Sequence, residues 1–350
     1  MLQHALLFVT LAAALPAAEW DSKAAASYLD QRTTWWMSWP GAQRDHGSFC
    51  ISCHTSGPYV FARPALRSLT HDTAPNAIEI KIVANVTKRV QQWKEALPAY
   101  PDKPADMHKT VESRGTESIW NALVLSAYQP PETKQAFDNM FEQQIMTGDN
   151  KGAWEWLQFH NSPWEGDSQF YGSVLAALAI GNMPADYRNQ PAIQRSTDLL
   201  RQYLNKNKDR QTPMDRVMLV WASTKLPHLL PPAQQQAILQ AALANQQPDG
   251  GISLGSLSPN WKRRDGTDIE TKPDGYATGL VAYVMQLAGT PRSDKQLQAA
   301  LNWLTANQEK SDGRWLAYSM NKQRDPSTEI GRFMADAATA YATLALTAAH

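Results

Sequence analysis

The feature that most constrains this chain is a repeat of paired helical segments. In each copy an amphipathic segment ends in Gln or Asn, a polar turn rich in Asp and Gly follows, and a more apolar segment comes next. Self-similarity of this kind indicates structural units that stack on one another. The amphipathic segments are residues 24–39, 78–93, 132–156, 192–207, 231–251 and 294–315, and their apolar partners are residues 58–66, 116–128, 166–181, 213–223, 273–289 and 332–349.

The apolar segments decide how the pairs assemble. A helix without a polar face must be buried on all sides, and an inner ring of such helices within an outer ring of amphipathic ones achieves this. Small residues such as Ala277, Gly279, Ala338 and Ala342 would let the inner helices approach closely. The sequence therefore predicts an all-α fold, an (α/α)6 toroid. A linear helical solenoid is the alternative, and the near-uniform burial of the apolar segments favours closure.

One copy of the repeat carries a family resemblance. The stretch LNWLTANQEKSDGRW (301–315) resembles the QW repeat of the squalene cyclase and prenyltransferase toroids, with weaker copies at 244–251 and 143–154. The matching positions are Trp303, Leu304, Gln308, Gly313 and Trp315. The resemblance spans roughly residues 78–350 and implies a terpenoid cyclase-like toroid, in which the Gln ties the outer helix to the next turn and stacks near the Trp.

Acidic residues near the starts of the apolar segments would meet at one mouth of such a ring. They are Glu117, Asp167, Asp215, Asp274 and Asp336. Acids are also favoured at helix N-termini for their own sake. Asp274 is the candidate catalytic acid if the chain is a cyclase. The Asp-x-Asp-Asp-type motif of proton-initiated squalene cyclases is absent, so the resemblance in fold does not carry the reaction with it.

The only two cysteines of the chain stand together in residues 50–54, which read CISCH. This is the C-x-x-C-H pattern of c-type haem attachment. Cys50 and Cys53 would form thioethers with the haem, and His54 would be the proximal ligand of the iron. The alternatives are a disulfide or thiol redox pair and a zinc site with His46 as a further ligand. The sequence predicts one covalent haem c.

Other residues enter as candidates around that haem. Arg63 is either a partner for a haem propionate or a surface cation. The distal ligand stays open, with Met37, His46, His71, Met107 and His108 as candidates. The predicted organisation is a signal peptide at 1–18, a first helix pair with the inserted haem motif at 19–77, and toroid repeats at 78–350. The haem would then lie at the mouth of the ring.

The first eighteen residues predict a secretory signal peptide. Their apolar run, 5–15, is too short to span a bilayer, and small residues follow it. An ordinary apolar first helix is the alternative. The mature protein is therefore expected to be periplasmic or otherwise exported and not membrane-spanning. With 33 Lys plus Arg against 33 Asp plus Glu, it has no basic excess that would indicate a nucleic-acid partner.

These observations give three hypotheses of function. The first is an exported monohaem c-type protein that transfers electrons with a redox partner protein, or oxidises a small apolar molecule as a haem-dependent oxidoreductase. The second is a non-enzymatic toroid that binds a lipid or a protein and carries a sensory or structural haem. The third is a terpenoid cyclase-like enzyme that uses Asp274.

Overall fold

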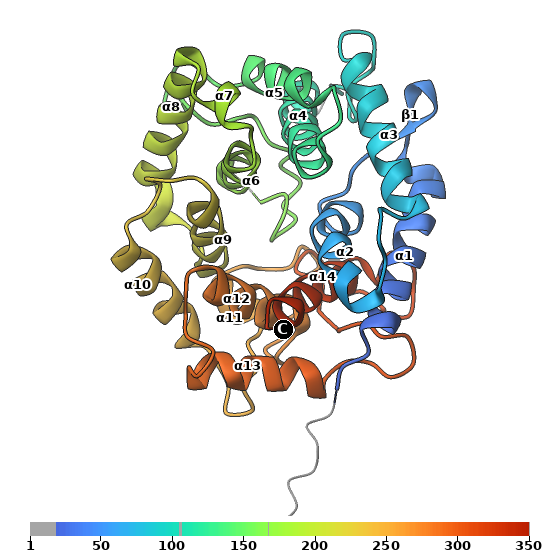
Figure 1. Cartoon of the computed structure of the whole chain (residues 1–350), viewed down its shortest axis with the longest axis vertical. Coiled ribbons are helices and arrows are strands. Elements are labelled where there is room, and N and C mark those ends of the chain that lie inside the picture. The colour runs from blue at the N-terminus through green and yellow to red at the C-terminus, as the bar shows by residue number, and fades with distance from the viewer. Residues whose placement is uncertain (1–18, 105–106, 167, 350) are drawn as a thin grey trace, which may run out of the picture.

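Apolar helices form an inner ring in the computed structural model, which describes residues 19–104, 107–166 and 168–349 (Figure 1). The inner helices are α2 (Ser56–Thr70), α4 (Lys109–Tyr128), α6 (Phe170–Gly181), α9 (Pro213–Lys225), α12 (Gly275–Leu287) and α14 (Phe333–Ala348). Each packs against the next, and α14 packs against α2. The ring is therefore closed, and a linear solenoid is excluded.

Amphipathic helices form the outer ring around these. They are α1 (Ser22–Ser38), α3 (Ala77–Gln91), α5 (Thr133–Glu142), α8 (Pro191–Asn207), α10 (Pro232–Leu243) and α13 (Lys295–Ala306). Burial separates the two classes: α6 is buried at every residue from Phe170 to Ile180, whereas α8 buries only one stripe, which includes Ile193, Leu200 and Leu204. This is the pattern that a continuous and a periodic apolar sequence predict.

Short elements connect the helices. They are α7 (Ala185–Arg188), α11 (Leu254–Leu257), the 3-10 turns η1 (Pro40–Ala42), η2 (Asp45–Gly47) and η3 (Lys208–Arg210), and the strands β1 (Gln43–Arg44) and β2 (Ser48–Phe49). The two strands pair antiparallel, with Gln43 opposite Phe49 and Arg44 opposite Ser48. This small hairpin lies between α1 and α2, directly before the cysteines.

Small residues let neighbouring inner helices touch through their backbones. A Cβ added to Gly279 of α12 would lie 2.5 Å from the backbone nitrogen of Ala342 in α14. No real Cβ contact is so short, so the two helices could not pack at this distance with a larger residue. The close approach expected from Gly279 and Ala342 is confirmed.

A glutamine at the end of three outer helices ties consecutive repeats together. The side-chain amides of Gln144, Gln246 and Gln308 each donate to a carbonyl in their own turn and to one at the start of the next outer helix. The acceptor pairs are, in order, Gly152 and Ser196, Gly250 and Gln296, and Gly313 and Asp21. Because Gln308 reaches Asp21, the last repeat is joined to the first.

The predicted (α/α)6 toroid is therefore confirmed, and each segment expected to be helical contains a helix of the ring. In the described part of the chain no helix is both long and apolar enough to cross a membrane. The predicted signal peptide at 1–18 lies outside the described residues.

Candidate functional site

Two adjoining hollows open at the end of the ring where the inner helices begin. The first has a cavity volume of about 80 Å³ and the second about 210 Å³. Their walls come from the first half of α4 and from the loops that precede α2, α6 and α14. Both are lined by Trp36, His54, Tyr100 and Glu165, so we treat them as one site and call it the mouth cleft.

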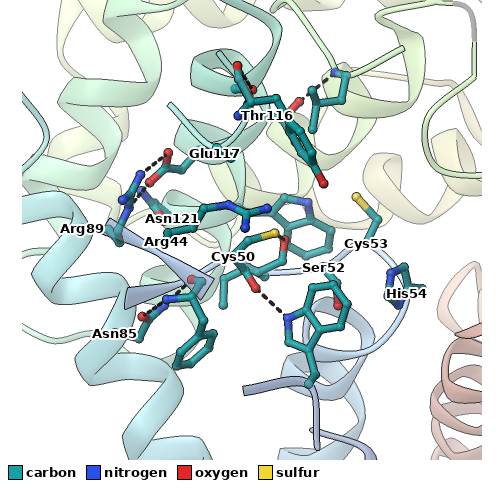
Figure 2. A pocket seen from close by; sticks show the side chains of 18 of the residues that line it. Arg44, Cys50, Ser52, Cys53, His54, Asn85, Arg89, Thr116, Glu117 and Asn121 are labelled. Carbon is teal, nitrogen blue, oxygen red and sulfur yellow. Dashed lines mark hydrogen bonds and ion pairs between the residues drawn. The ribbon is translucent and has the colours of Figure 1, made fainter. Parts of the chain in front are cut away.

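The segment with the two cysteines forms one wall of the cleft, and hydrogen bonds fix it on both sides. The side chain of Asn85 in α3 accepts from the backbone of Phe49 and donates back to it, both at 2.9 Å. The backbone nitrogen of Cys50 donates to Ala42 at 2.9 Å, and the Trp36 indole donates to the Cys50 carbonyl at 2.7 Å. Figure 2 shows Cys50, Cys53 and His54 in sequence along this wall.

His54 is packed among aromatic rings. Its imidazole stacks on Phe333 with 3.8 Å between ring centroids and meets the edge of Trp36 at 4.9 Å. Burial, together with the positive charges of Arg32 and Arg324, lowers the pKa of His54 to about 3, so the ring is neutral at physiological pH.

A hydrogen-bond chain behind His54 sets which of its nitrogens carries the proton. The Thr55 hydroxyl donates to Asp336 at 2.6 Å, so at 2.8 Å it can only accept from Nδ1 of His54. Arg32 in turn donates to both oxygens of Asp336. The Nε2 atom of His54 is therefore left as an acceptor.

The first hollow holds a charged pair on its wall. Arg89 of α3 donates from Nε and Nη2 to the two carboxylate oxygens of Glu117 in α4, at 2.6 and 2.9 Å (Figure 2). Asp45 also accepts from Arg89. Glu117 was expected at the start of its helix, but α4 begins at Lys109, so Glu117 lies two turns inside it.

Glu165 is the carboxyl group that both hollows share. It ends a tight turn closed by two backbone hydrogen bonds with Asn161, of 2.7 and 2.9 Å, and the Asn161 amide also donates to its Oε2 at 2.9 Å. Burial raises the pKa of Glu165, although the hydrogen bond from Asn161 acts the other way. Burial therefore favours the protonated form of Glu165.

The cleft also contains cations without carboxylate partners. Among the described residues neither Arg44 in the first hollow nor Arg324 in the second forms an ion pair, and Nε of Arg44 has no hydrogen-bond partner. Burial lowers the pKa of Arg324. The aromatic walls of the second hollow are Trp36, Trp39, Tyr100, Phe159, Trp164 and Phe333.

Most of the residues expected around a haem lie outside this cleft. Arg63 is buried and donates to Asp30 at 3.1 Å and to Asp72 at 2.8 Å, so it is no propionate partner. The five distal candidates do not line either hollow. Met37 is buried in the core, His46 lies beside Asp45, His71 is the C-cap of α2, Met107 is exposed, and His108 is the N-cap of α4.

The predicted ring of acids is divided between different roles. Glu117 lines the cleft and Asp336 supports His54, whereas Asp167 lies outside the described residues. Asp274 is the N-cap of α12 and accepts from the backbone nitrogens of Leu254 and Ala277 at 2.6 and 2.8 Å. Burial raises the pKa of Asp274 to about 7. It does not line the cleft, so the structure gives it a capping role.

The sequence analysis did not identify Arg44, Arg89, Glu165 and Arg324 as residues of the cleft. Arg89 lies on α3, and the other three lie outside the repeated helices, where periodicity carries no information. The signal that could have drawn attention to Glu165 is its loop, residues 154–165, which combines several aromatic residues with polar ones between an outer and an inner segment.

Comparisons with known proteins bear on the fold. No protein-family model and no curated protein matches the chain. An unsaturated glucuronyl hydrolase from Bacillus sp. GL1, responsible for the degradation of glycosaminoglycan, is structurally similar, with a TM-score of 0.54, 10% identity and coverage of 93% of this chain and 94% of that one. A structure titled UGL with dGlcA-Glc-Rha-Glc is also similar, with a TM-score of 0.53, 10% identity and coverage of 93% of this chain and 95% of that one.

A possible member of the GH105 family from Salmonella enterica serovar Paratyphi A is similar to the same degree, with a TM-score of 0.53, 11% identity and coverage of 98% of both chains. These similar structures correct the assignment to the squalene cyclase and prenyltransferase families, since they are toroids of sugar hydrolases. The hypotheses of haem electron transfer and of a terpenoid cyclase are therefore wrong.

The predicted haem c is wrong as well. Among the described residues, no three or more His, Cys, Asp or Glu side chains are grouped to hold a metal ion. Phe333 covers a face of the His54 ring, and Trp36 packs against the same ring with its edge. These residues do not fit the group. At this level of identity the similarities establish one thing about the chain, which is that it shares the α/α toroid fold of these hydrolases.

Proposed function

We propose that this protein is a glycoside hydrolase that binds an acidic oligosaccharide in the mouth cleft. The observation that carries the proposal is that two carboxyl groups in different electrostatic surroundings line the same hollow. Glu165 has a pKa raised by burial, whereas Glu117 is paired with Arg89 through both of its oxygens. A pair of carboxyl groups in contrasting environments is the usual equipment of glycosidases.

Each carboxyl group has a distinct role in this mechanism. Glu165 donates its proton to the glycosidic oxygen as the bond between that oxygen and the anomeric carbon breaks. A water molecule then supplies the new hydroxyl group and gives up its other proton, which restores the protonated Glu165. Positive charge develops on the sugar ring in the transition state. Glu117 supplies a negative charge on the wall of the hollow, and this charge stabilises the positively charged transition state. Arg89 holds Glu117 in position.

The other residues of the cleft position the sugar. The aromatic rings of Trp36, Trp164 and Phe333 give apolar surfaces against which the faces of sugar rings can pack. His54 offers Nε2 as an acceptor for a sugar hydroxyl, and the chain through Thr55 to Asp336 fixes its orientation. The molecule proposed for the cleft is thus a sugar rather than the apolar compound expected from the sequence.

The charge of the cleft favours an acidic sugar. Arg44 and Arg324 have no carboxylate partner in the described residues, although Arg44 donates to the carbonyls of Gly41 and Gln43. A partly buried cation without a counter-ion is costly until an anion reaches it. A sugar carboxylate would meet that need. The names of the structurally similar proteins, which refer to unsaturated glucuronyl groups and to dGlcA, support the same substrate class.

The test is the release of sugar from oligosaccharides that end in a glucuronyl or an unsaturated glucuronyl residue, compared with the same oligosaccharides ending in glucose. We expect turnover of the acidic substrates and little of the neutral ones. Because Glu165 acts as an acid, the rate should be highest below its raised pKa and fall as the pH rises through that pKa. Glu165→Gln should lower kcat by about 10²–10⁴-fold and remove this alkaline limb.

The matched control is Glu155→Gln, because Glu155 is in the same loop, accepts a hydrogen bond from Gln169 and lies outside both hollows. It should keep the rate and the pH profile of the native protein. The absence of turnover on all of these substrates, or a Glu165→Gln variant as active as the Glu155→Gln control, would contradict the proposal.

A further inference from the structure

The proposed hydrolysis leaves one feature of the cleft wall without a role. Cys50 and Cys53 are the only cysteines in 350 residues, and both line the first hollow. They supply no charge to the reaction, because burial raises the pKa of Cys50 to about 11 and that of Cys53 well above its ordinary value. The presence of two uncharged thiols, three residues apart, in the wall of the cleft therefore needs another explanation.

The structure holds both cysteines as free thiols, but the local backbone does not exclude a bond between the two sulfurs. Residues 50–53 belong to neither a helix nor a strand, so no regular hydrogen-bond ladder holds their side chains apart. The segment is anchored at one end by Ala42 and Trp36, which bind the Cys50 backbone. At the other end Ser56 accepts from the Ser52 nitrogen at 2.9 Å. Two cysteines this close along a non-helical segment can bring their Cα atoms within the roughly 4.4–6.8 Å that a disulfide requires.

The surroundings of the sulfurs also favour the bonded form. Cys53 is buried, and the one hydrogen bond recorded for the Cys50 thiol is a long contact of 3.6 Å to the carbonyl of Ile51. A disulfide has no polar hydrogen to satisfy, so it suits the buried position of Cys53 better than a free thiol does.

We propose that Cys50 and Cys53 form a disulfide, made while the chain folds in an oxidising compartment. The export predicted from residues 1–18 would bring the chain to such a compartment. The oxidant is a small-molecule or protein disulfide. One cysteine thiolate attacks it to give a mixed disulfide and one released thiol, and the second cysteine displaces the other thiol. Two thiols of the chain are oxidised, and one external disulfide is reduced to two thiols.

The bond would fix the wall that the two hollows share. His54 directly follows Cys53, and its ring must stay between Phe333 and Trp36 for Nε2 to keep its orientation. A covalent link across residues 50–53 reduces the conformations open to this segment in the unfolded chain. It also limits the movement of His54 in the folded one. This inference does not rest on the proposed hydrolysis, because it concerns the state of the sulfurs.

The test is made on the full chain exported to a bacterial periplasm. The purified protein is denatured in the presence of iodoacetamide without a reductant, then digested and weighed. We expect a peptide containing residues 50–53 that carries no alkyl group and is about 2 Da lighter than its sequence. Prior reduction should let it take up two alkyl groups. In the Cys50→Ser variant, Cys53 should be alkylated without prior reduction. In the Cys53→Ser variant, Cys50 should likewise be alkylated without prior reduction.

A second measurement keeps the test independent of whether these variants fold. Reduction of the native protein, without any substitution, should lower its Tm by a few degrees. The inference is overturned if both cysteines of the exported protein are alkylated without reduction. It is equally overturned if the peptide is heavier than its sequence, which would mean that the sulfurs are bonded to another group.

Discussion

Acidic residues in the first half of the inner helices serve more than one purpose. Asp336 holds the chain that orients His54, Glu117 lines the cleft, and Asp215 belongs to the first turn of α9. The Thr212 hydroxyl donates to Asp215 at 2.8 Å, yet burial still raises the pKa of Asp215 to about 6. Acidic residues in the first half of the inner helices thus serve support, charge and capping.

Asp215 gives a prediction about stability and pH. Its pKa in the folded chain, about 6, is above the ordinary value of 3.8, so between these two values the folded state holds a proton that the unfolded state releases. Stability should therefore fall as the pH rises from about 4 to about 6. Asp215→Asn keeps an acceptor for Thr212 without the charge, and should reduce this fall by on the order of 1 kcal/mol.

Urea unfolding at pH 4.5 and pH 7 measures the effect. Asp209→Asn is the control, because Asp209 is exposed and lies shortly before the same helix, and it should leave the pH dependence of the native protein unchanged. An Asp215→Asn variant with the same pH dependence as the control would show that the Asp215 carboxyl does not contribute in this range.

At the residue scale, the sequence predicted the location of a site more accurately than its chemistry. The CISCH segment does line the mouth, because its place between the first outer and inner segments follows from the repeat. Its chemistry was misjudged because a five-residue pattern cannot reveal that Phe333, almost 280 residues away, packs on His54. Glu165 and Arg324 lie in loops and become neighbours of the cleft only once the ring has closed.

At the scale of elements, the turns that follow the outer helices α5, α10 and α13 are joints built from the same parts. The glutamine binds the next outer helix, and a glycine with positive φ allows the chains to touch. Gly152 has φ +95°, and a Cβ there would lie 2.2 Å from the carbonyl oxygen of Leu199 in α8. Gly250 and Gly313 repeat this arrangement, with φ of 94° and 79°. The geometry of these joints allows only a few residue types, and this is why the repeat could be recognised in the sequence.

The joint predicts a large difference between two glycines in one turn. Gly148 and Gly152 both have positive φ, but a Cβ on Gly148 would meet nothing within 4 Å. Gly148→Ala should therefore cost only the left-handed conformation, about 1–2 kcal/mol. Gly152→Ala adds an overlap with the backbone of α8 and should cost clearly more. Urea unfolding of the two variants measures the difference, and equal losses would mean that α8 moves away at little cost.

At the scale of the whole molecule, closure separates this protein from linear repeat proteins. In a linear array each repeat contacts only its neighbours, and unfolding can spread from an end. Here α14 packs on both α12 and α2, and Gln308 bonds with the backbone nitrogen and carbonyl of Asp21. The ring has no end repeat from which unfolding could begin.

Unfolding should accordingly be a single transition. We expect far-UV circular dichroism, which reports helix, and tryptophan fluorescence, which reports packing, to give the same midpoint and the same slope in urea. Gln308→Ala leaves the Asp21 and Gly313 carbonyls without this donor and should lower the midpoint while the two probes still coincide. Two separate transitions in the native protein would contradict the expectation that the ring is one cooperative unit.

The contact between α14 and α2 also affects the order in which parts of the ring can fold. Domains tend to fold from the N-terminus while the ribosome is still working, but here one flank of α2 has no covering until residues 333–348 have been synthesised. The apolar surface of α2 therefore stays uncovered until α14 can pack on it. Dependence on chaperones should be greatest before this contact forms.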